Sequence, residues 1–262
     1  MDLETMRYAV EGGVATVTLD RPEGANAVNP AFARDLRAVM VEIEFDPAVR
    51  AVMVTANGKV FCAGGDLKEF HAAGAGLPRL AGDMLVDFHG ALYRMNRMPK
   101  TVVAAVAGSA GGAGLSLVSA FDLVVAGESA KFTMAYTRAG VTPDGTSTYF
   151  LSRHIGVRRA LDLTLNNRVL TAAEAEAWGL VNRVVADDEV EATARDMATE
   201  LAGGASWAVG MAKRLIYEGF DSPLPEAGER EGQVITQAMA RSDGQEGIAA
   251  FTEKRAPNFT GE

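Results

Sequence analysis

Residues 135–150, AYTRAGVTPDGTSTYF, contain one acidic side chain, Asp144, between a proline and a glycine. Most of the surrounding side chains are apolar, small or hydroxylic. A carboxylate in such a turn is commonly a solvated turn residue or a helix cap. In an apolar pocket, however, it becomes a better proton acceptor, because burial disfavours its charged form. The segment therefore leaves two interpretations of Asp144, a turn residue or a general base.

Two glycine-rich turns have similar sequences, FCAGGD at 61–66 and GSAGGAG at 108–114. Each follows an apolar stretch and leads into a helical pattern, so main-chain N–H groups are left unpaired and point outward. Close packing of helix on sheet is one explanation. A dinucleotide site is disfavoured, because the second turn matches G-x-G-x-x-G only loosely and no P-loop motif is present. A third interpretation fits both turns best: each turn supplies one N–H donor, and the two donors together bind one carbonyl oxygen as an oxyanion hole.

The elements that must position these residues alternate between strand and helix. Asn29 and Pro30 predict a helix start, and the apolar spacing that follows predicts one buried face. Buried strands joined by helices indicate a parallel sheet, and the pattern is too short and irregular for an eight-fold barrel. The predicted strands are 14–20, 51–56, 101–108, 122–127 and 180–185, and a long helix is predicted over 83–98.

The pattern becomes mostly helical in the last third of the chain. Thr171 and Glu174 have the spacing of a capping box, and Gly179 predicts the end of that helix. From residue 187 onward nearly every segment has a helical pattern. We therefore expect an α/β core over residues 1–200 and a C-terminal helical region over 201–262.

Composition excludes several classes. The chain has 262 residues, 48% of them hydrophobic. Its formal net charge of −9 disfavours binding to nucleic acid. Its single cysteine, Cys62, cannot form an intrachain disulfide or a multi-cysteine zinc site. There is no signal-peptide pattern and no run near the roughly 20 apolar residues of a membrane span. A soluble, cytoplasmic protein without membrane or nucleic-acid partners is expected.

Four spaced motifs resemble the enoyl-CoA hydratase/isomerase (crotonase) superfamily over almost the whole chain. They are VFCAGGDLKEF, GSAGGAGLSLVSAFDLVVAGESAKF, AGVTPDGTSTYFLSRHIGVRRALDL and AAEAEAWGLVNRVV, and the closing AFTEKRAPNF is also similar. The resemblance implies an α/β spiral of ββα units with C-terminal helices that build trimers, often paired into hexamers. It implies an acyl-CoA thioester substrate and no separate cofactor or metal, because coenzyme A is part of the substrate.

The resemblance also assigns roles to individual positions. The two N–H groups of the oxyanion hole map to Ala63 and Ala113. Positions matching Phe251 and Lys254 reach the coenzyme A of a neighbouring subunit, and Arg21 lies near the CoA phosphates. The full set of implied substrate contacts is Ala63, Gly64, Gly65, Asp66, Leu67, Gly112, Ser116, Arg21, Phe251 and Lys254.

The sequence departs from the family at the positions that decide the reaction. Hydratases of the family use two glutamates, and here those positions are Ser116 and Tyr136. Hydration needs one group to activate water and another to deliver a proton, whereas an isomerase needs only one carboxylate. Family members with an acid at position 144 include double-bond isomerases and an aryl-CoA dehalogenase. Asp144 is therefore expected to be an acid/base in an isomerase. Tyr136 either shapes the pocket or donates its hydroxyl, and Ser116 makes room for the acyl group.

Several alternatives stay open at this point. Asp144 as a nucleophile would give a hydrolytic or dehalogenase-like enzyme, and a hydratase-like reaction is a further alternative. Loss of both glutamates would also fit a non-catalytic acyl-CoA-binding protein. The motifs VTPDG and STYF look like the branch that acts on ring-bearing substrates, such as acyl-CoAs of phenylacetate degradation.

Other reactive side chains are isolated. His71, His89 and His154 lie in different segments without a spaced partner, which indicates solvated or capping histidines. Cys62 follows a strand-like segment and is expected to be a packed thiol. The segment 69–82, EFHAAGAGLPRLAG, is expected to form a wall of the pocket as a loop.

Overall fold

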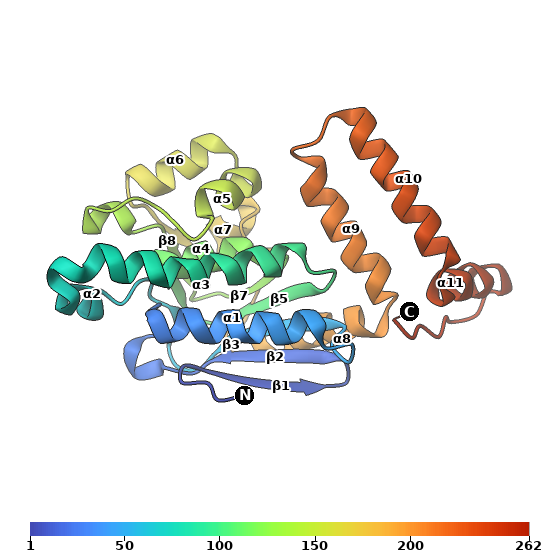
Figure 1. Cartoon of the computed structure of the whole chain (residues 1–262), viewed down its shortest axis with the longest axis horizontal. Coiled ribbons are helices and arrows are strands. Elements are labelled where there is room, and N and C mark those ends of the chain that lie inside the picture. The colour runs from blue at the N-terminus through green and yellow to red at the C-terminus, as the bar shows by residue number, and fades with distance from the viewer. Residues whose placement is uncertain (262) are drawn as a thin grey trace.

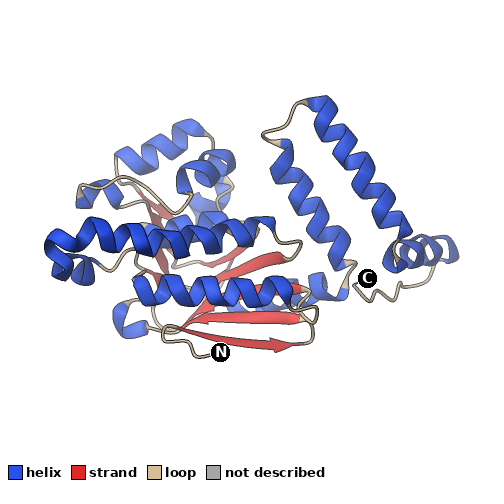
Figure 2. Cartoon of the chain, in the orientation of Figure 1, coloured by secondary structure: helices blue, strands red, loops and turns tan. Residues whose placement is uncertain are grey.

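The computed structural model describes residues 1–261 and contains two β-sheets with helices around them (Figures 1 and 2). The larger sheet has the strand order β1-β2-β3-β5-β7-β10, in which β1 and β2 are antiparallel and the other pairs are parallel. Its strands are β1 (Met6–Glu11), β2 (Val14–Leu19), β3 (Ala51–Ala56), β5 (Thr101–Val106), β7 (Leu123–Gly127) and β10 (Arg183–Val185).

A second sheet of shorter strands has the order β4-β6-β8-β9, with only the β8–β9 pair antiparallel. Its strands are β4 (Val60–Cys62), β6 (Ser109–Gly111), β8 (Lys131–Thr133) and β9 (Val169–Thr171). Three successive strand pairs, β3–β4, β5–β6 and β7–β8, pass from the large sheet to the small one. The predicted strand over 101–108 corresponds to β5 alone, and the short strand β6 that follows it was not predicted. A three-residue strand spans barely one period of alternation, so its pattern is not recognisable in the sequence.

Helices α1 (Pro30–Phe45) and α3 (Leu77–Arg97) pack against each other (Figure 1). The predicted cap is confirmed, since the Asn29 side chain accepts a hydrogen bond from the Phe32 N–H. Helix α3 begins earlier than the predicted residue 83, and α2 (Leu67–Ala73) precedes it. The expected loop over 69–82 is therefore largely helical. The predicted apolar stripe of α1 is buried: Phe32, Leu36, Val39, Met40 and Ile43.

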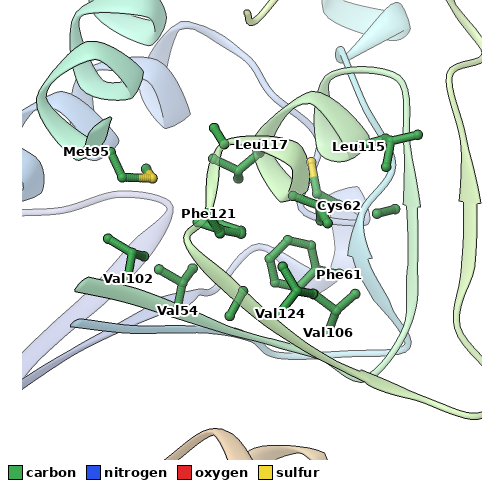
Figure 3. Packing of buried hydrophobic residues seen from close by; sticks show 14 of the residues in the cluster. Val54, Phe61, Cys62, Met95, Val102, Val106, Leu115, Leu117, Phe121 and Val124 are labelled. Atoms are coloured by element: carbon green, nitrogen blue, oxygen red, sulfur yellow. The ribbon is translucent and has the colours of Figure 1, made fainter. Parts of the chain in front are cut away.

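One part of the core surrounds the short helix α4 (Ala113–Ala120), every residue of which is buried (Figure 3). Phe61 and Phe121 meet edge to face with ring centroids 6.2 Å apart. All six residues of β5 are buried, as expected of a strand covered on both faces. Burying a valine or phenylalanine side chain of this core contributes about 1.5–3 kcal/mol. Helix α4 and the turn that precedes it are thus held rigidly.

Helix α8 (Val190–Gly203) packs on the large sheet through a stripe of small side chains, Val190, Ala194, Ala198 and Ala202. The remaining helices of this part are α5 (Ser147–Ile155), α6 (Val157–Leu165) and α7 (Ala172–Trp178). Three short 3-10 turns are η1 (Pro22–Gly24), η2 (Gly74–Gly76) and η3 (Tyr136–Ala139). The capping box of α7, with Thr171 and Glu174, is confirmed, and the helix ends at Gly179.

The last helices, α9 (Ser206–Gly219), α10 (Leu224–Ala240) and α11 (Ser242–Glu253), project from the α/β part (Figure 1). The buried Lys213 of α9 forms an ion pair with Asp122 at 2.7 Å, which fastens this helix to the core. Helix α10 buries no residue and leaves Leu224, Ile235 and Met239 more than half exposed. In the part of the chain that the structure describes, no helix has the length and apolar character needed to span a membrane.

Candidate active site

The two glycine-rich turns pack backbone against backbone. Gly64 has φ +110° and Gly112 has φ +48°, values that favour glycine. A Cβ atom at Gly64 would lie 2.9 Å from the Gly111 carbonyl oxygen and 3.5 Å from the Ala113 nitrogen. The predicted meeting of the two turns therefore occurs, and it depends on the absence of a side chain at residue 64.

The Ala63 N–H is not free. It donates to the Ala25 carbonyl oxygen at 3.0 Å, so the expectation that it serves as an oxyanion donor is wrong. Val28 pairs with Gly65 as a parallel bridge, in which the Val28 N–H bonds to Gly64 and the Asp66 N–H bonds to Val28. This pairing turns the Gly65 N–H away from Val28. The Gly65 N–H has no acceptor within residues 1–261. The free donor of this turn is therefore Gly65.

Ala113 is the first residue of α4, and Gly112 is its N-cap. An N–H at the first position of a helix has no intrahelical partner, and the helix dipole adds positive potential there. The Gly112 N–H bonds to the Thr133 carbonyl oxygen at 2.9 Å, whereas the Ala113 N–H meets no acceptor among the described residues. Gly65 and Ala113 thus present one free N–H each where the two turns touch.

Asp144 is linked to the second glycine turn by the hydroxyl groups of Tyr136 and Ser116. The Tyr136 hydroxyl donates to Asp144 Oδ1 at 2.6 Å, and Ser116 Oγ lies 2.9 Å from the Tyr136 oxygen. Ser116 is fully buried on α4, and its Oγ lies 2.9 Å from the Asp144 carbonyl oxygen and 3.3 Å from that of Gly112. The structure therefore brings the three singled-out side chains, at 116, 136 and 144, into one hydrogen-bonded cluster.

The main chain around Asp144 is tightly held. Its carbonyl oxygen also accepts from the Ser147 hydroxyl at 2.8 Å and the Ser147 N–H at 3.2 Å. The next residues, Gly145 and Thr146, have φ +59° and +61°, and for a β-branched residue this conformation costs of order 1–2 kcal/mol. Asp144 Oδ2 has no hydrogen-bond partner within residues 1–261. The constrained turn thus leaves one carboxylate oxygen available.

Tyr136 acts as a hydrogen-bond donor throughout the physiological pH range. Burial, followed by the negative charge of Asp144, raises the pKa of the Tyr136 phenol well above its ordinary value. The phenol therefore keeps its proton and continues to donate to the carboxylate. Tyr136 is expected either to shape the pocket or to donate its hydroxyl. The structure shows a hydroxyl that donates to Asp144.

Arg21 and Asp66 form an ion pair beside the first turn. Asp66 is the N-cap of α2 and accepts from the Glu69 N–H at 3.2 Å, and the pair with Arg21 helps to hold the pKa of its carboxyl below the ordinary value although burial opposes this. Arg21 also lies 3.3 Å from the Ala27 carbonyl oxygen. The positive charge of Arg21 is thus largely balanced by contacts within the chain. Leu67, the first residue of α2, is 61% exposed.

Phe251 and Lys254 do not join this cluster within one chain. They lie at the end of α11, on the opposite side of the molecule from α2 (Figure 1). Phe251 is 87% exposed, and Lys254 is exposed with φ +56°. Any contact of these two residues with a ligand at the glycine turns requires a second copy of the chain.

Cys62 is buried at the end of β4, as expected of a packed thiol. Burial raises its pKa to about 12. We expect the folded protein to resist a disulfide reagent at pH 8, and the unfolded protein in guanidinium chloride to react fully, because only the thiolate attacks. Stability should fall as pH rises from about 9 toward 12, where the unfolded chain binds fewer protons. Fast stoichiometric labelling of the folded protein would contradict the expected resistance of Cys62 to the reagent. Cys62→Ala is the unlabelled control.

The histidines differ from one another in their surroundings. His89 on α3 is half-buried, and its Nε2 accepts from the Gly145 N–H at 3.3 Å, directly after Asp144. His154 Nε2 lies 2.9 Å from the Ser119 carbonyl oxygen, and His71 is exposed near the end of α2. Sequence reasoning missed His89 as a site residue, since nothing in its own segment points to a turn that lies 56 positions away.

Comparison with known proteins gives the class of this fold and site. The family model described as enoyl-CoA hydratase/isomerase matches residues 9–262. The chain is 36% identical over 261 residues to a protein of Rhodobacter capsulatus named "Probable enoyl-CoA hydratase", covering all of both chains. It is 35% identical over 260 residues to the 1,2-epoxyphenylacetyl-CoA isomerase of Escherichia coli, covering 99% of each.

Solved structures give the same result. An enoyl-CoA hydratase from Polaromonas superposes with a TM-score of 0.93 at 33% identity, covering 97% of this chain and 99% of that one. The chain therefore belongs to the enoyl-CoA hydratase/isomerase (crotonase) family. The expected crotonase-type α/β fold, with C-terminal helices, is confirmed, and the family acts on acyl-CoA.

Proposed function

We propose that this chain is an acyl-CoA double-bond isomerase in which Asp144 is the only acid/base. The observation that carries the proposal is the position of Asp144. Its Oδ1 is occupied by Tyr136 at 2.6 Å, its Oδ2 is free, and Ser116 connects it to the turn that carries the Ala113 N–H. One carboxylate oxygen next to two unpaired amides is what a proton transfer alpha to a thioester needs.

The reaction begins with removal of a proton from the carbon next to the thioester carbonyl. Negative charge then develops on the carbonyl oxygen, and the Gly65 and Ala113 N–H groups stabilise it more in the enolate than in the ground state. Asp144 Oδ2 holds the proton and returns it to the carbon two bonds away. The double bond moves by one position, and no water is consumed.

Hydration is disfavoured by the chemistry of the neighbouring side chains. Ser116 and Tyr136 occupy the positions of the family's two glutamates, and burial together with the Asp144 charge raises the pKa of the Tyr136 phenol. A phenol that keeps its proton cannot activate water as a base. Ser116 is fully buried and directs its hydroxyl to main-chain and phenol oxygens.

A ring-bearing acyl group is the substrate class that the motifs VTPDG and STYF favour, together with the similarity to an isomerase of 1,2-epoxyphenylacetyl-CoA. We therefore place ring-bearing acyl-CoAs before straight-chain enoyl-CoAs in the order of expected substrates.

The C-terminal helices are proposed to assemble the chain into a trimer or a pair of trimers. Helix α10 has an apolar stripe but no buried residue, so a neighbouring copy is needed to cover it. We expect a native mass of three or six times the 27.6 kDa chain by light scattering. Lys254→Glu should raise KM for CoA thioesters and leave that mass unchanged. A monomeric mass at micromolar concentration would contradict this assembly.

A turnover screen tests the proposed reaction. Purified protein is incubated with 3-enoyl-, 2-enoyl- and ring-bearing acyl-CoA thioesters, and products are separated by mass and by double-bond position. Isomerisation without hydration supports the proposal. Hydration of the 2-enoyl thioester or halide release from a halogenated aryl-CoA would overturn it, and binding of CoA without any turnover would indicate a non-catalytic member.

A further inference from the structure

His89 of α3 contacts the turn that carries Asp144 from outside the cluster described above. The Gly145 N–H donates to His89 Nε2 at 3.3 Å. Because the backbone amide is the donor, this ring nitrogen must be the acceptor. In this contact the ring proton of His89 therefore lies on Nδ1 and not on Nε2.

The place of Gly145 leaves little freedom for another arrangement. A Cβ atom at this residue would lie 2.9 Å from the Phe88 ring and 2.9 Å from Ser116 Cβ. The main chain is thus enclosed between α3 and α4, and its N–H points at the His89 side chain of α3. Loss of that acceptor leaves a buried N–H unpaired, which a turn avoids by shifting.

We propose that His89 is a positioning residue, which sets the direction of the Asp144 carboxylate by holding the amide that follows it. The inference rests on the proposed function for its kinetic consequence. Tyr136 fixes one carboxylate oxygen, Ser116 and Ser147 fix the carbonyl oxygen, and His89 fixes the adjoining N–H. Without the last of these, the peptide after Asp144 is held only through its carbonyl oxygen, so it can tilt about that oxygen and move Oδ2 relative to the substrate.

Two substitutions of the same histidine separate this role from a general packing role. Glutamine places its Oε1 near the position of Nε2, so His89→Gln keeps the acceptor. Asparagine is polar but too short, since its side chain reaches only the position of Nδ1. Tyr93→Phe, one turn further along α3 with the ring centroids 6.1 Å apart, is the matched control for a change on that helix.

The kinetic expectation is a change in kcat and not in KM. His89→Asn should lower kcat by about 10- to 100-fold, because a displacement of about 1 Å costs up to about 100-fold. His89→Gln should stay within about threefold of the wild type, and Tyr93→Phe should be unchanged. Equal kcat values for His89→Asn and wild type, or a glutamine variant as slow as the asparagine one, would overturn the proposal.

A second measurement does not depend on turnover. Amide hydrogen exchange of the peptide covering residues 140–148 is followed by mass spectrometry, with far-UV circular dichroism and Tm to verify folding. Faster exchange in His89→Asn, restored in His89→Gln, supports the inference, and unchanged exchange in both overturns it. If the wild type turns over no thioester, the proposed function fails, and exchange alone decides whether His89 positions the turn.

Discussion

Asp144→Asn is expected to lower kcat for isomerisation by about 10²–10⁴-fold, the range that a positioned acid/base contributes. The amide has nearly the same shape, and its oxygen still accepts from the Tyr136 hydroxyl that now lies 2.6 Å from Oδ1. The fold should therefore be preserved, with Tm within about 3 °C of the wild type. Oδ2 is the atom that changes, because an amide nitrogen in its place cannot take up a proton.

Asp188→Asn provides a matched control, since Asp188 is an exposed carboxylate after β10 and outside the cluster. It should keep the full rate. Isomerisation by Asp144→Asn at the wild-type rate would exclude Asp144 as the base. Trapping of a covalent ester on Asp144 would instead identify it as a nucleophile.

Ala113→Pro is expected to give the second large effect, a loss of about 10²–10³-fold in kcat, because it removes one donor of the oxyanion hole. Only a substitution that deletes a main-chain N–H tests this role directly. The first position of a helix tolerates proline better than any later one, and α1 of this chain already begins with Pro30. The change should therefore leave α4 folded while it removes the donor.

Ala172→Pro is the control for the effect of a proline ring on folding at the first position of a helix. Ala172 is also a buried alanine at the first position of a helix, α7, but the residue before it is the N-cap Thr171 rather than a glycine. Circular dichroism and Tm verify both folds, and calorimetric titration measures binding of CoA. Full activity of a folded Ala113→Pro protein would remove Ala113 from the oxyanion hole, whereas loss in both variants would indicate a general effect of proline.

The order of the main elements could be predicted from local sequence. The cap at Asn29, the apolar stripe of α1 and the capping box at Thr171 depend on residues three or four positions apart, and all three are present. The short strands of the second sheet and the first strand, β1, were not predicted. Their stability comes from pairing with strands elsewhere in the chain, which a local pattern does not encode.

The candidate site was predicted in its residue types more than in its contacts. Ser116, Tyr136 and Asp144 were singled out and do form one cluster. The donor of the first glycine turn was misassigned, because Ala25 occupies the Ala63 N–H and the bridge to Val28 leaves Gly65 free. Both partners belong to a loop more than 30 positions away in the sequence.

By itself, the sequence determined the family resemblance, the loss of both hydratase glutamates and the identity of the remaining acid, because these are properties of residue types at given spacings. Only the tertiary structure decided which amides stay unpaired, which carboxylate oxygen stays free and which histidine meets the turn. Each of these depends on hydrogen bonds between segments far apart in the chain. Such bonds are selected by the packing of two sheets and their helices as a whole.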